Sequence, residues 1–307
     1  MKISSNNEWS TLKSVVVGSA TNANWPINDP VFNQESTKTL WKETPVPKGA
    51  VPQWIVDEAN EDLELLCHTL AGHGVEVHRP NDMDFVNLDG MYNYCPRDRL
   101  IIAGDTVIDP AMMYPCRDQE LATLDYVVNS AKNVFTMPRN QGMTLDAANV
   151  CRLGDTWLVL ESASGNQQAI DWLQEQLPEI KIESCNLYAG VHIDSTICPL
   201  REGVVMLNAS RVNSVNCPKV FDGWEKIWVT NCVPQSFHEY PYASKWVGMN
   251  CLSIDDNTVI IDTAQTAIIN SLKSLKFTVI PLTLRHSRTL GGSFHCVTLD
   301  LLRETNK

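Results

Sequence analysis

A cysteine follows two glycines near the end of the chain, in the sequence LGGSFHCVTLD at positions 290–300. Gly291 and Gly292 carry no side chain, so the backbone there can approach a ligand closely. A thiolate is a nucleophile, which makes Cys296 a candidate for covalent chemistry. Taken alone, such a cysteine is more often a buried core residue, and the neighbouring His295 would point to the opposite face of a strand.

A histidine and an aspartate stand two positions apart in the sequence AGVHIDST at positions 189–196. On a strand, His192 and Asp194 would project to the same face. A histidine can relay protons near neutral pH, and a carboxylate can hold a cation beside it. The alternative is a purely structural hydrogen bond between the two side chains, and this segment alone does not decide between them.

Two further aspartates, Asp98 in CPRD and Asp146 in LDAAN, come directly before apolar runs. Single aspartates at such positions usually form turns. Together with Asp194 and Cys296, however, they stand at equivalent places in successive units of a repeated pattern. If these units close into a ring, the carboxylates and the thiol meet near its axis. That set suits a planar, permanently cationic guanidinium group, with His192 placed to protonate a departing amine.

The repeated pattern is a strand, a tight turn and a second strand. Apolar, often β-branched runs flank turn residues that tolerate positive φ, which predicts four β-hairpins, at positions 99–109, 150–161, 196–208 and 251–262. The last three hairpins are followed by a helical stretch and a further strand. These pairs lie at 166–177 with 180–182, 220–224 with 226–229, and 264–275 with 277–280.

The two ends of the chain supply what resembles a fifth unit. A strand at 12–17, a helix at 55–73 and a strand at 75–77 come first, and the final strand at 293–301 could pair with the first. Five hairpin-plus-helix units in a ring would leave no exposed sheet edge. A doubly wound sheet is the rival fold, but the sequence has neither a GxGxxG nor a Walker motif. We therefore expect one α/β domain over residues 1–307.

Composition excludes some classes of partner. The 36 acidic and 24 basic residues give a net charge of −12, and no cluster of Lys and Arg interrupts it, so we expect no nucleic-acid partner. The N-terminal segment lacks the apolar core of a signal peptide, and no stretch reaches the roughly 20 apolar residues of a membrane span. The ten cysteines form no CxxC pair, which is typical of reduced thiols in a cytoplasmic protein that does not bind a membrane.

The sequence resembles the glycine amidinotransferases of the guanidino-modifying (pentein) superfamily, nearly from end to end. The resemblance is carried by NEWSTLKSVVVG at 7–18, by PRD at 96–98, LDAA at 145–148, HIDST at 192–196, SKW at 244–246 with MN at 249–250, and GGSFHC at 291–296. It implies a fivefold pseudosymmetric α/β propeller. It also implies transfer of the amidino group of L-arginine to an amine through an amidino-Cys296 intermediate, with ornithine released, ping-pong kinetics and no metal or organic cofactor. Members are often homodimers.

Carried over by position, the resemblance assigns roles to particular residues. Cys296 becomes the nucleophile, His192 the general acid and base, and Asp146 the carboxylate that orients it. The donor-binding positions are Asp98 and Asp194 for the guanidinium, Arg211 for the α-carboxylate, and Ser244 as a nearby hydrogen-bond donor. Without the resemblance, Arg211 would be interpreted as a surface salt bridge and Ser244 as a helix cap.

The chain departs from the glycine enzymes on the acceptor side. Ala189 and Val191 replace Asn and Met, and Arg288 replaces Asn. The small Ala189 suggests the hypothesis of an acceptor larger than glycine, while Arg288 could bind an acceptor carboxylate or pair with a surface acid. Two other functions stay open: a guanidino-group hydrolase such as an arginine deiminase or dihydrolase, in which water is the acceptor, and a non-catalytic arginine sensor.

Overall fold

The computed structural model describes residues 1–38 and 46–304, and it contains five three-stranded sheets built on one plan. In each sheet, two antiparallel strands are completed by a third strand that runs parallel to the middle one. The sheets are β17 (Thr298–Glu304), β1 (Thr11–Val17) and β4 (Glu76–His78); β5 (Ile101–Ala103), β6 (Thr106–Asp109) and β7 (Asn133–Thr136); β8 (Val150–Arg152), β9 (Thr156–Leu160) and β10 (Lys181–Cys185); β11 (Ile197–Arg201), β12 (Val204–Asn208) and β13 (Glu225–Val229); and β14 (Leu252–Asp255), β15 (Thr258–Asp262) and β16 (Thr278–Leu282).

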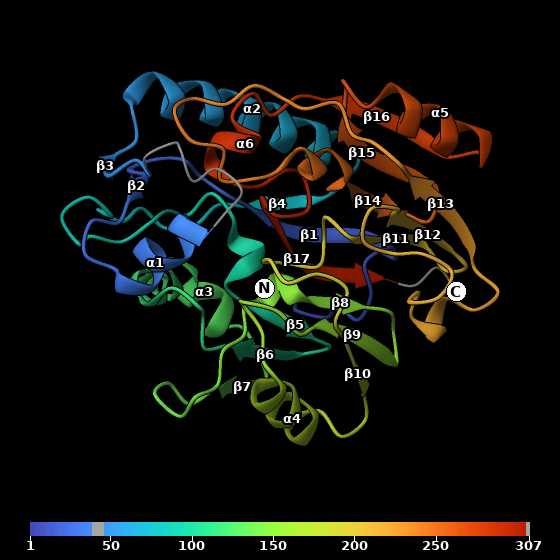
Figure 1. Cartoon of the computed structure of the whole chain (residues 1–307), viewed down its shortest axis with the longest axis horizontal. Helices are drawn as coiled ribbons and strands as arrows, with labels where there is room; N and C mark the ends of the chain where they lie inside the picture. The colour runs from blue at the N-terminus through green and yellow to red at the C-terminus, as the bar shows by residue number, and fades with distance from the viewer. Residues whose placement is uncertain (39–45, 305–307) are drawn as a thin grey trace.

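A parallel pair needs a crossover connection, and helical segments supply it in every sheet. The crossovers are α2 (Gln53–Gly72), η2 (Pro115–Leu124) with α3 (Asp125–Val128), α4 (Gln167–Gln176), η4 (Lys219–Phe221) and α5 (Thr266–Ser274). Figure 1 shows α2, α4 and α5 at the periphery and β1 beside β17 near the middle of the view. Smaller elements precede or link the sheets: β2 (Asn24–Trp25), α1 (Pro30–Lys38), β3 (Gly49–Ala50), η1 (Pro96–Asp98), η3 (Ala147–Asn149), η5 (Lys245–Met249) and α6 (Ser287–Leu290).

This arrangement confirms the predicted fivefold pseudosymmetric α/β propeller. All four hairpins form, and the final strand pairs antiparallel with the first, with Val15 opposite Asp300. The predicted start of the final strand was wrong, because this strand begins at Thr298 rather than at Ser293. Residues 293–297 instead form turns, in which the backbone N–H of Val297 donates to the carbonyl of Ser293.

The peripheral helices bury the same short pattern of side chains. Helix α4 buries Ala169, Ile170 and Leu173, and α5 buries Ile268, Ile269 and Leu272. This i, i+1, i+4 spacing places three apolar side chains on one helical face, which packs against the sheet. Each fully buried Leu or Ile stabilises the fold by about 1.5–3 kcal/mol relative to an exposed one.

A buried network of charges ties the N-terminal segment to the sheets. Arg152 at the end of β8 donates from Nε and Nη2 to the Glu8 carboxylate, at 2.9 Å in each case. The same guanidinium also pairs with Asp300 of β17, which Arg97 and Arg303 contact as well. Separating a buried ion pair leaves an uncompensated charge in the interior, which is costly. This network therefore holds Glu8 in a defined position.

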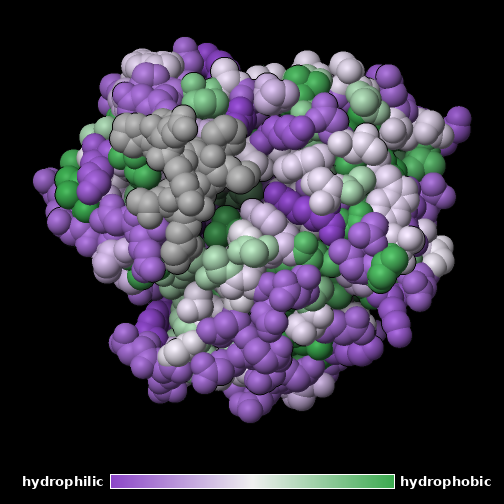
Figure 2. All heavy atoms as spheres, viewed as in Figure 1, coloured by the Kyte–Doolittle hydropathy of each residue, from purple (hydrophilic) through white to green (hydrophobic). Residues whose placement is uncertain are grey.

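Figure 2 shows that one face of the molecule is largely hydrophilic, with a hollow near its middle. Among the described helices, none combines the length and the apolar character needed to cross a membrane.

Candidate active site

Short irregular segments lead into the first strand of each hairpin, and we call them lead-in segments. Asp98 ends η1 before β5, Asp146 directly precedes η3 and β8, and Asp194 lies in the loop before β11. Cys296 lies two residues before β17. The ring brings these segments together, so residues far apart in sequence meet in one buried cluster.

His192 is joined to two of the predicted acids. Its Nε2 lies 3.0 Å from Oδ2 of Asp146, and its Nδ1 lies 3.7 Å from Oδ1 of Asp98. The other Asp146 oxygen accepts a hydrogen bond of 2.8 Å from the backbone N–H of Met113, which fixes the carboxylate. The imidazole is thus oriented by Asp146, and Nδ1 is the nitrogen that faces Asp98.

The expectation that His192 and Asp194 share a strand face was wrong. His192 adopts φ 62°, in the left-handed region, and the segment is a bend followed by a turn. The side-chain carbonyl of Asn149 accepts the His192 backbone N–H at 2.9 Å, and Ile193 donates to the carbonyl of Ala148. These contacts with η3 replace strand pairing and aim the two side chains separately.

Cys296 and Asp194 are in direct contact. The Cys296 thiol donates to Oδ2 of Asp194 at 3.1 Å, and the side-chain oxygen of Asn250 accepts the Cys296 backbone N–H at 3.1 Å. Gly292 lies against this thiol. A Cβ at Gly292 would stand 2.7 Å from Cys296 Cβ and 2.5 Å from the Cys95 sulfur, so only glycine fits there.

Within the described part of the chain, one oxygen of Asp98 accepts a hydrogen bond and the other does not. Its Oδ2 accepts from Nη1 of Arg117 at 2.8 Å, and Arg117 is itself forked onto Glu120. The Oδ1 atom is buried and has no hydrogen-bond partner among the residues that the structure describes. A buried carboxylate oxygen without a donor is costly, and a cationic donor next to His192 would satisfy it.

The charges of the cluster shift its pKa values. Burial alone would lower the pKa of His192, but the charge of Asp98, followed by the hydrogen bond and charge of Asp146, raises it to about 9. Burial would raise the pKa of Asp194, but its hydrogen bond with His295 and the charges of His295 and His192 lower it to about 2. At neutral pH the site therefore contains an imidazolium and an ionised acid.

Cys296, the candidate nucleophile, is a protonated thiol at neutral pH in the absence of substrate. The hydrogen bond with Cys95, burial, and the charge of Asp194 raise the pKa of Cys296 well above its ordinary value. The anionic surroundings that suit a cationic substrate thus disfavour the thiolate until that cation binds.

Arg211 lies beside the cluster. Its guanidinium stacks 3.6 Å from the centre of the Tyr188 ring, and Nη1 donates to the hydroxyls of Thr196 at 2.7 Å and Ser195 at 3.1 Å. The surface salt bridge considered from sequence does not describe Arg211, because these hydrogen bonds go to hydroxyls.

Ser244, in contrast, is the N-cap of η5 and accepts from the backbone N–H of Trp246 at 3.3 Å. Its predicted substrate contact stays a prediction.

The acceptor-side candidates occupy two places. Ala189 is exposed and Val191 is half-buried in the loop that leads to His192. Arg288 in α6 is 5% exposed. Its Nε and Nη1 donate to the backbone carbonyls of Ala243 and Gln235 at 3.1 and 2.8 Å. An acceptor-binding role for Arg288 stays a prediction.

Sequence reasoning missed residues that hold the cluster in place. Asn250 accepts from the backbone N–H groups of both His295 and Cys296, and it stands in the lead-in segment of the fourth hairpin. Asn250 precedes its hairpin as Asp98 and Asp146 precede theirs, so the repeat pattern could have identified it as a site residue. Glu8 and Cys95 carried no such signal, because only folding brings them to the site.

No group of three or more His, Cys, Asp or Glu in residues 1–38 and 46–304 is placed to hold a metal ion.

The known proteins that this chain resembles over nearly its whole length include several amidinotransferases. No protein-family profile matches it. It is 36% identical to inosamine-phosphate amidinotransferase 1 from Streptomyces griseus, across 98% of this chain and 97% of the relative. It is 26% identical to the mitochondrial glycine amidinotransferase of Xenopus tropicalis, across 98% and 83%. The solved structure of the inosamine-phosphate amidinotransferase from Streptomyces griseus superposes with a TM-score of 0.92 at 35% identity, covering 99% of this chain and 97% of that chain.

Proposed function

The chain belongs to the amidinotransferases and has their pentein fold, and on that premise we propose that it moves the amidino group of L-arginine to an amine through a covalent intermediate on Cys296. The observation that carries the proposal is the contact between Cys296 and Asp194, together with the buried Asp98 oxygen that accepts no hydrogen bond from the described residues. A flat cation held by the two acids would lie beside the thiol, and His192, whose Nδ1 is 3.7 Å from Oδ1 of Asp98, would be close to it.

The donor guanidinium would lie between Asp98 and Asp194. Its forked N–H groups match the free Asp98 oxygen and the ionised Asp194 carboxylate. Its positive charge offsets the acids that raise the pKa of Cys296, so arginine binding favours the thiolate. Arg211 would meet the α-carboxylate of the substrate, with its guanidinium held by Tyr188 and Thr196.

In the first half-reaction, sulfur attacks the guanidino carbon and the carbon–nitrogen bond to ornithine breaks. His192 donates the proton that the departing nitrogen needs, from the Nδ1 that faces Asp98. The thiol proton passes to solvent when the guanidinium binds, so this half-reaction ends with an amidino-thioether, a neutral ornithine nitrogen and a neutral His192 imidazole. In the second half-reaction, the incoming amine attacks the amidino carbon and gives its proton to His192, while the carbon–sulfur bond breaks. This step restores the imidazolium and the thiolate, and the thiolate takes a proton from solvent when the product leaves.

Intact-mass spectrometry after incubation with arginine alone tests the intermediate. We expect one amidino group to be added to the wild-type protein, and none to Cys296→Ala, which should keep arginine binding but lose turnover. Cys67→Ala is the matched control, because Cys67 lies in α2 and contacts Arg79 rather than the site. A fully active Cys296→Ala variant would contradict the assignment of the nucleophile.

A guanidino-group hydrolase is the second candidate, since water could take the place of the amine. The 36% identity to a transferase over nearly the whole chain favours transfer. Assaying arginine with and without amines separates the two. Ornithine together with a new guanidine indicates transfer, whereas citrulline and ammonia would indicate hydrolysis. Arginine binding without turnover by the wild type would indicate a sensor.

We also propose that the acceptor is an amine larger than glycine. Higher identity to an inosamine-phosphate enzyme than to a glycine enzyme supports this, as does the small, exposed Ala189 before His192. Turnover should be compared for glycine, lysine, amino sugars and an inosamine phosphate at one arginine concentration. A clear preference for glycine would refute the proposal.

Other expectations stay predictions. We expect a cytoplasmic homodimer that needs no metal or organic cofactor and binds neither nucleic acid nor membranes. Size-exclusion chromatography with light scattering measures the oligomeric state. Extensive dialysis against a chelator should leave the turnover rate unchanged.

A further inference from the structure

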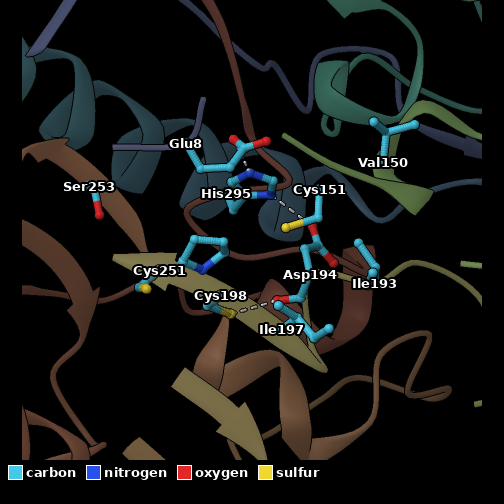
Figure 3. A pocket seen from close by; sticks show the side chains of 11 residues that line it. Glu8, Val150, Cys151, Ile193, Asp194, Ile197, Cys198, Cys251, Ser253 and His295 are labelled. Carbon is cyan, nitrogen blue, oxygen red and sulfur yellow. Dashed lines mark hydrogen bonds and ion pairs between the residues drawn. The ribbon is translucent and has the colours of Figure 1, made fainter. Parts of the chain in front are cut away.

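The imidazole of His295 lies between two buried acids, Asp194 and Glu8. Its Nδ1 is 3.0 Å from Oδ2 of Asp194, and its Nε2 is 3.2 Å from Oε2 of Glu8. Figure 3 shows His295 in this position, with Glu8 on one side and Asp194 on the other. The Asp194 oxygen that contacts His295 is the one that accepts from the Cys296 thiol.

Both ring nitrogens therefore face carboxylate oxygens. A neutral imidazole has one N–H and one lone pair, so in this position its lone pair would oppose an acid. Only the imidazolium, with two N–H groups, can donate to both acids. Burial would raise the pKa values of both Glu8 and Asp194, but the hydrogen bonds and charges of neighbouring groups lower them, so both acids are ionised and the two contacts fit the charged form of His295.

The surroundings of His295 include few other charges. Arg97, whose Nε is 3.4 Å from the His295 carbonyl, opposes the imidazolium, and Glu8 is shared with Arg152. The thiols of Cys151, Cys198 and Cys251 line the cavity that His295 and Asp194 border. Burial raises the pKa of the Cys151 thiol. The pKa of the Cys198 thiol is raised first by a hydrogen bond between Cys198 and Cys251 and then by burial. Both thiols are therefore neutral. Glu8 and Asp194 remain the two anions in contact with the ring.

We propose that His295 is a positioning residue: clamped as an imidazolium between Glu8 and Asp194, it keeps the Asp194 carboxylate ionised and aimed at the Cys296 sulfur and the guanidinium site. This role deepens the proposed function, on which it rests. It also assigns Glu8 a function, because Glu8 supplies the second charge that holds the proton on His295.

The electrostatic balance agrees with this geometry. Burial and the charge of Arg97 would lower the pKa of His295, but its hydrogen bonds with Asp194 and Glu8 outweigh them and raise it. The backbone N–H of His295 donates to Asn250 at 2.9 Å, beside that of Cys296. The backbones of His295 and Cys296 therefore donate to the same side-chain oxygen. A displacement of His295 would for this reason move both Asp194 and Cys296.

Nitrogen-15 NMR of histidine-labelled wild-type protein tests the charge directly. We expect both ring nitrogens of His295 to be protonated at about pH 7, with the signal identified by its loss in His295→Asn. A non-protonated ring nitrogen at that pH would overturn the proposal. This measurement needs no turnover, so it stands apart from a failure to detect the amidino adduct on Cys296, which would refute the proposed function instead.

Steady-state kinetics test the positioning role. In His295→Asn the amide can still donate to Asp194 but carries no charge. Loss of the His295 charge raises the pKa of Asp194 in the variant, so a larger share of Asp194 is protonated at low pH. We therefore expect the KM of the variant for arginine to exceed that of the wild type about tenfold or more near pH 5, and by less near pH 8. Glu8→Gln should show the same dependence more weakly. His78→Asn is the control, because His78 in β4 contacts Ser14 and Glu76 outside the site. A uniform loss of kcat, or an unchanged KM at both pH values in a folded His295→Asn, would overturn the role.

Discussion

Nε2 of His192 and Oδ2 of Asp146 lie 3.0 Å apart, although 46 positions separate the two residues in sequence. The contact commits one imidazole nitrogen to a fixed carboxylate and leaves the other for substrate. It exists because the lead-in segments of neighbouring hairpins meet at the centre of the ring. Its consequences for catalysis and for stability can both be measured.

Replacing Asp146 with Asn should shift the pH profile of the enzyme. The variant loses one of the carboxylates that raise the pKa of His192 to about 9. The imidazolium then gives up its proton at a lower pH, so the falling limb of kcat/KM should move to lower pH, with a loss of about 100-fold or more near pH 8. A pH profile of kcat/KM for arginine measures this shift. An unmoved falling limb would mean that Asp146 does not act through His192.

The same imidazolium should make stability depend on pH. Because the pKa of His192 is raised from 6.5 to about 9, its contribution to stability is fully present below 6.5 and is lost as the pH rises through about 9. The difference in unfolding free energy between wild type and His192→Gln should therefore shrink, by up to about 3 kcal/mol, from about pH 6 to about pH 10. Urea titrations at the two pH values provide the comparison, and a constant difference would contradict the prediction.

Gly292→Ala should inactivate the protein with little loss of fold. The new Cβ would lie 2.5 Å from the Cys95 sulfur and 2.7 Å from Cys296 Cβ, so the nucleophile must move. We expect turnover and amidino-adduct formation to fall at least about 100-fold, since displacements near 1 Å can cost that much. Gly72→Ala is the matched control, because its Cβ would meet no atom within 4 Å. Full activity of Gly292→Ala would show that Cys296 need not hold its place.

Arg211→Met should discriminate between donors. If Arg211 meets the α-carboxylate, kcat/KM for arginine should fall about tenfold to a hundredfold, the range of one charged hydrogen bond. Agmatine, which lacks that carboxylate, should lose much less. Arg201→Met, which removes a guanidinium stacked 4.3 Å from the Phe277 ring outside the site, should affect neither donor. Equal losses with arginine and agmatine would argue for a structural role of Arg211.

Arg117→Met should destabilise the fold strongly. The Arg117 guanidinium lies between Asp98 and Glu120, and all three side chains are 3% exposed. Removing it leaves two buried acids without their counter-ion, at a cost of about 3–5 kcal/mol. Arg79→Met breaks a more exposed pair with Glu64 and should cost less than about 1 kcal/mol. Chemical denaturation measures both values, and similar losses for the two variants would contradict the prediction.

Much of the fold was predictable because its signals are local. Alternating or continuous apolar runs around turns such as Gly154-Asp155 specify a hairpin within about a dozen residues, and all four hairpins formed. Where local signals were weak, boundaries moved: the helix expected at 220–224 is one turn, η4 at Lys219–Phe221. The strand expected to begin at Ser293 begins at Thr298, since the residues before it form a turn whose backbone N–H groups at His295 and Cys296 donate to the Asn250 side chain.

The amino-acid sequence by itself determined the repeat pattern, the residue types of the site and the family resemblance, because each is written in short contiguous segments. Tertiary structure alone decided that His192 takes a left-handed bend rather than a strand, and that Glu8, His295 and Asp194 form one line of contacts. Those relationships join the N-terminus, mid-chain and C-terminus. They depend on ring closure, burial and the resulting electrostatic field, which no local pattern of residues encodes.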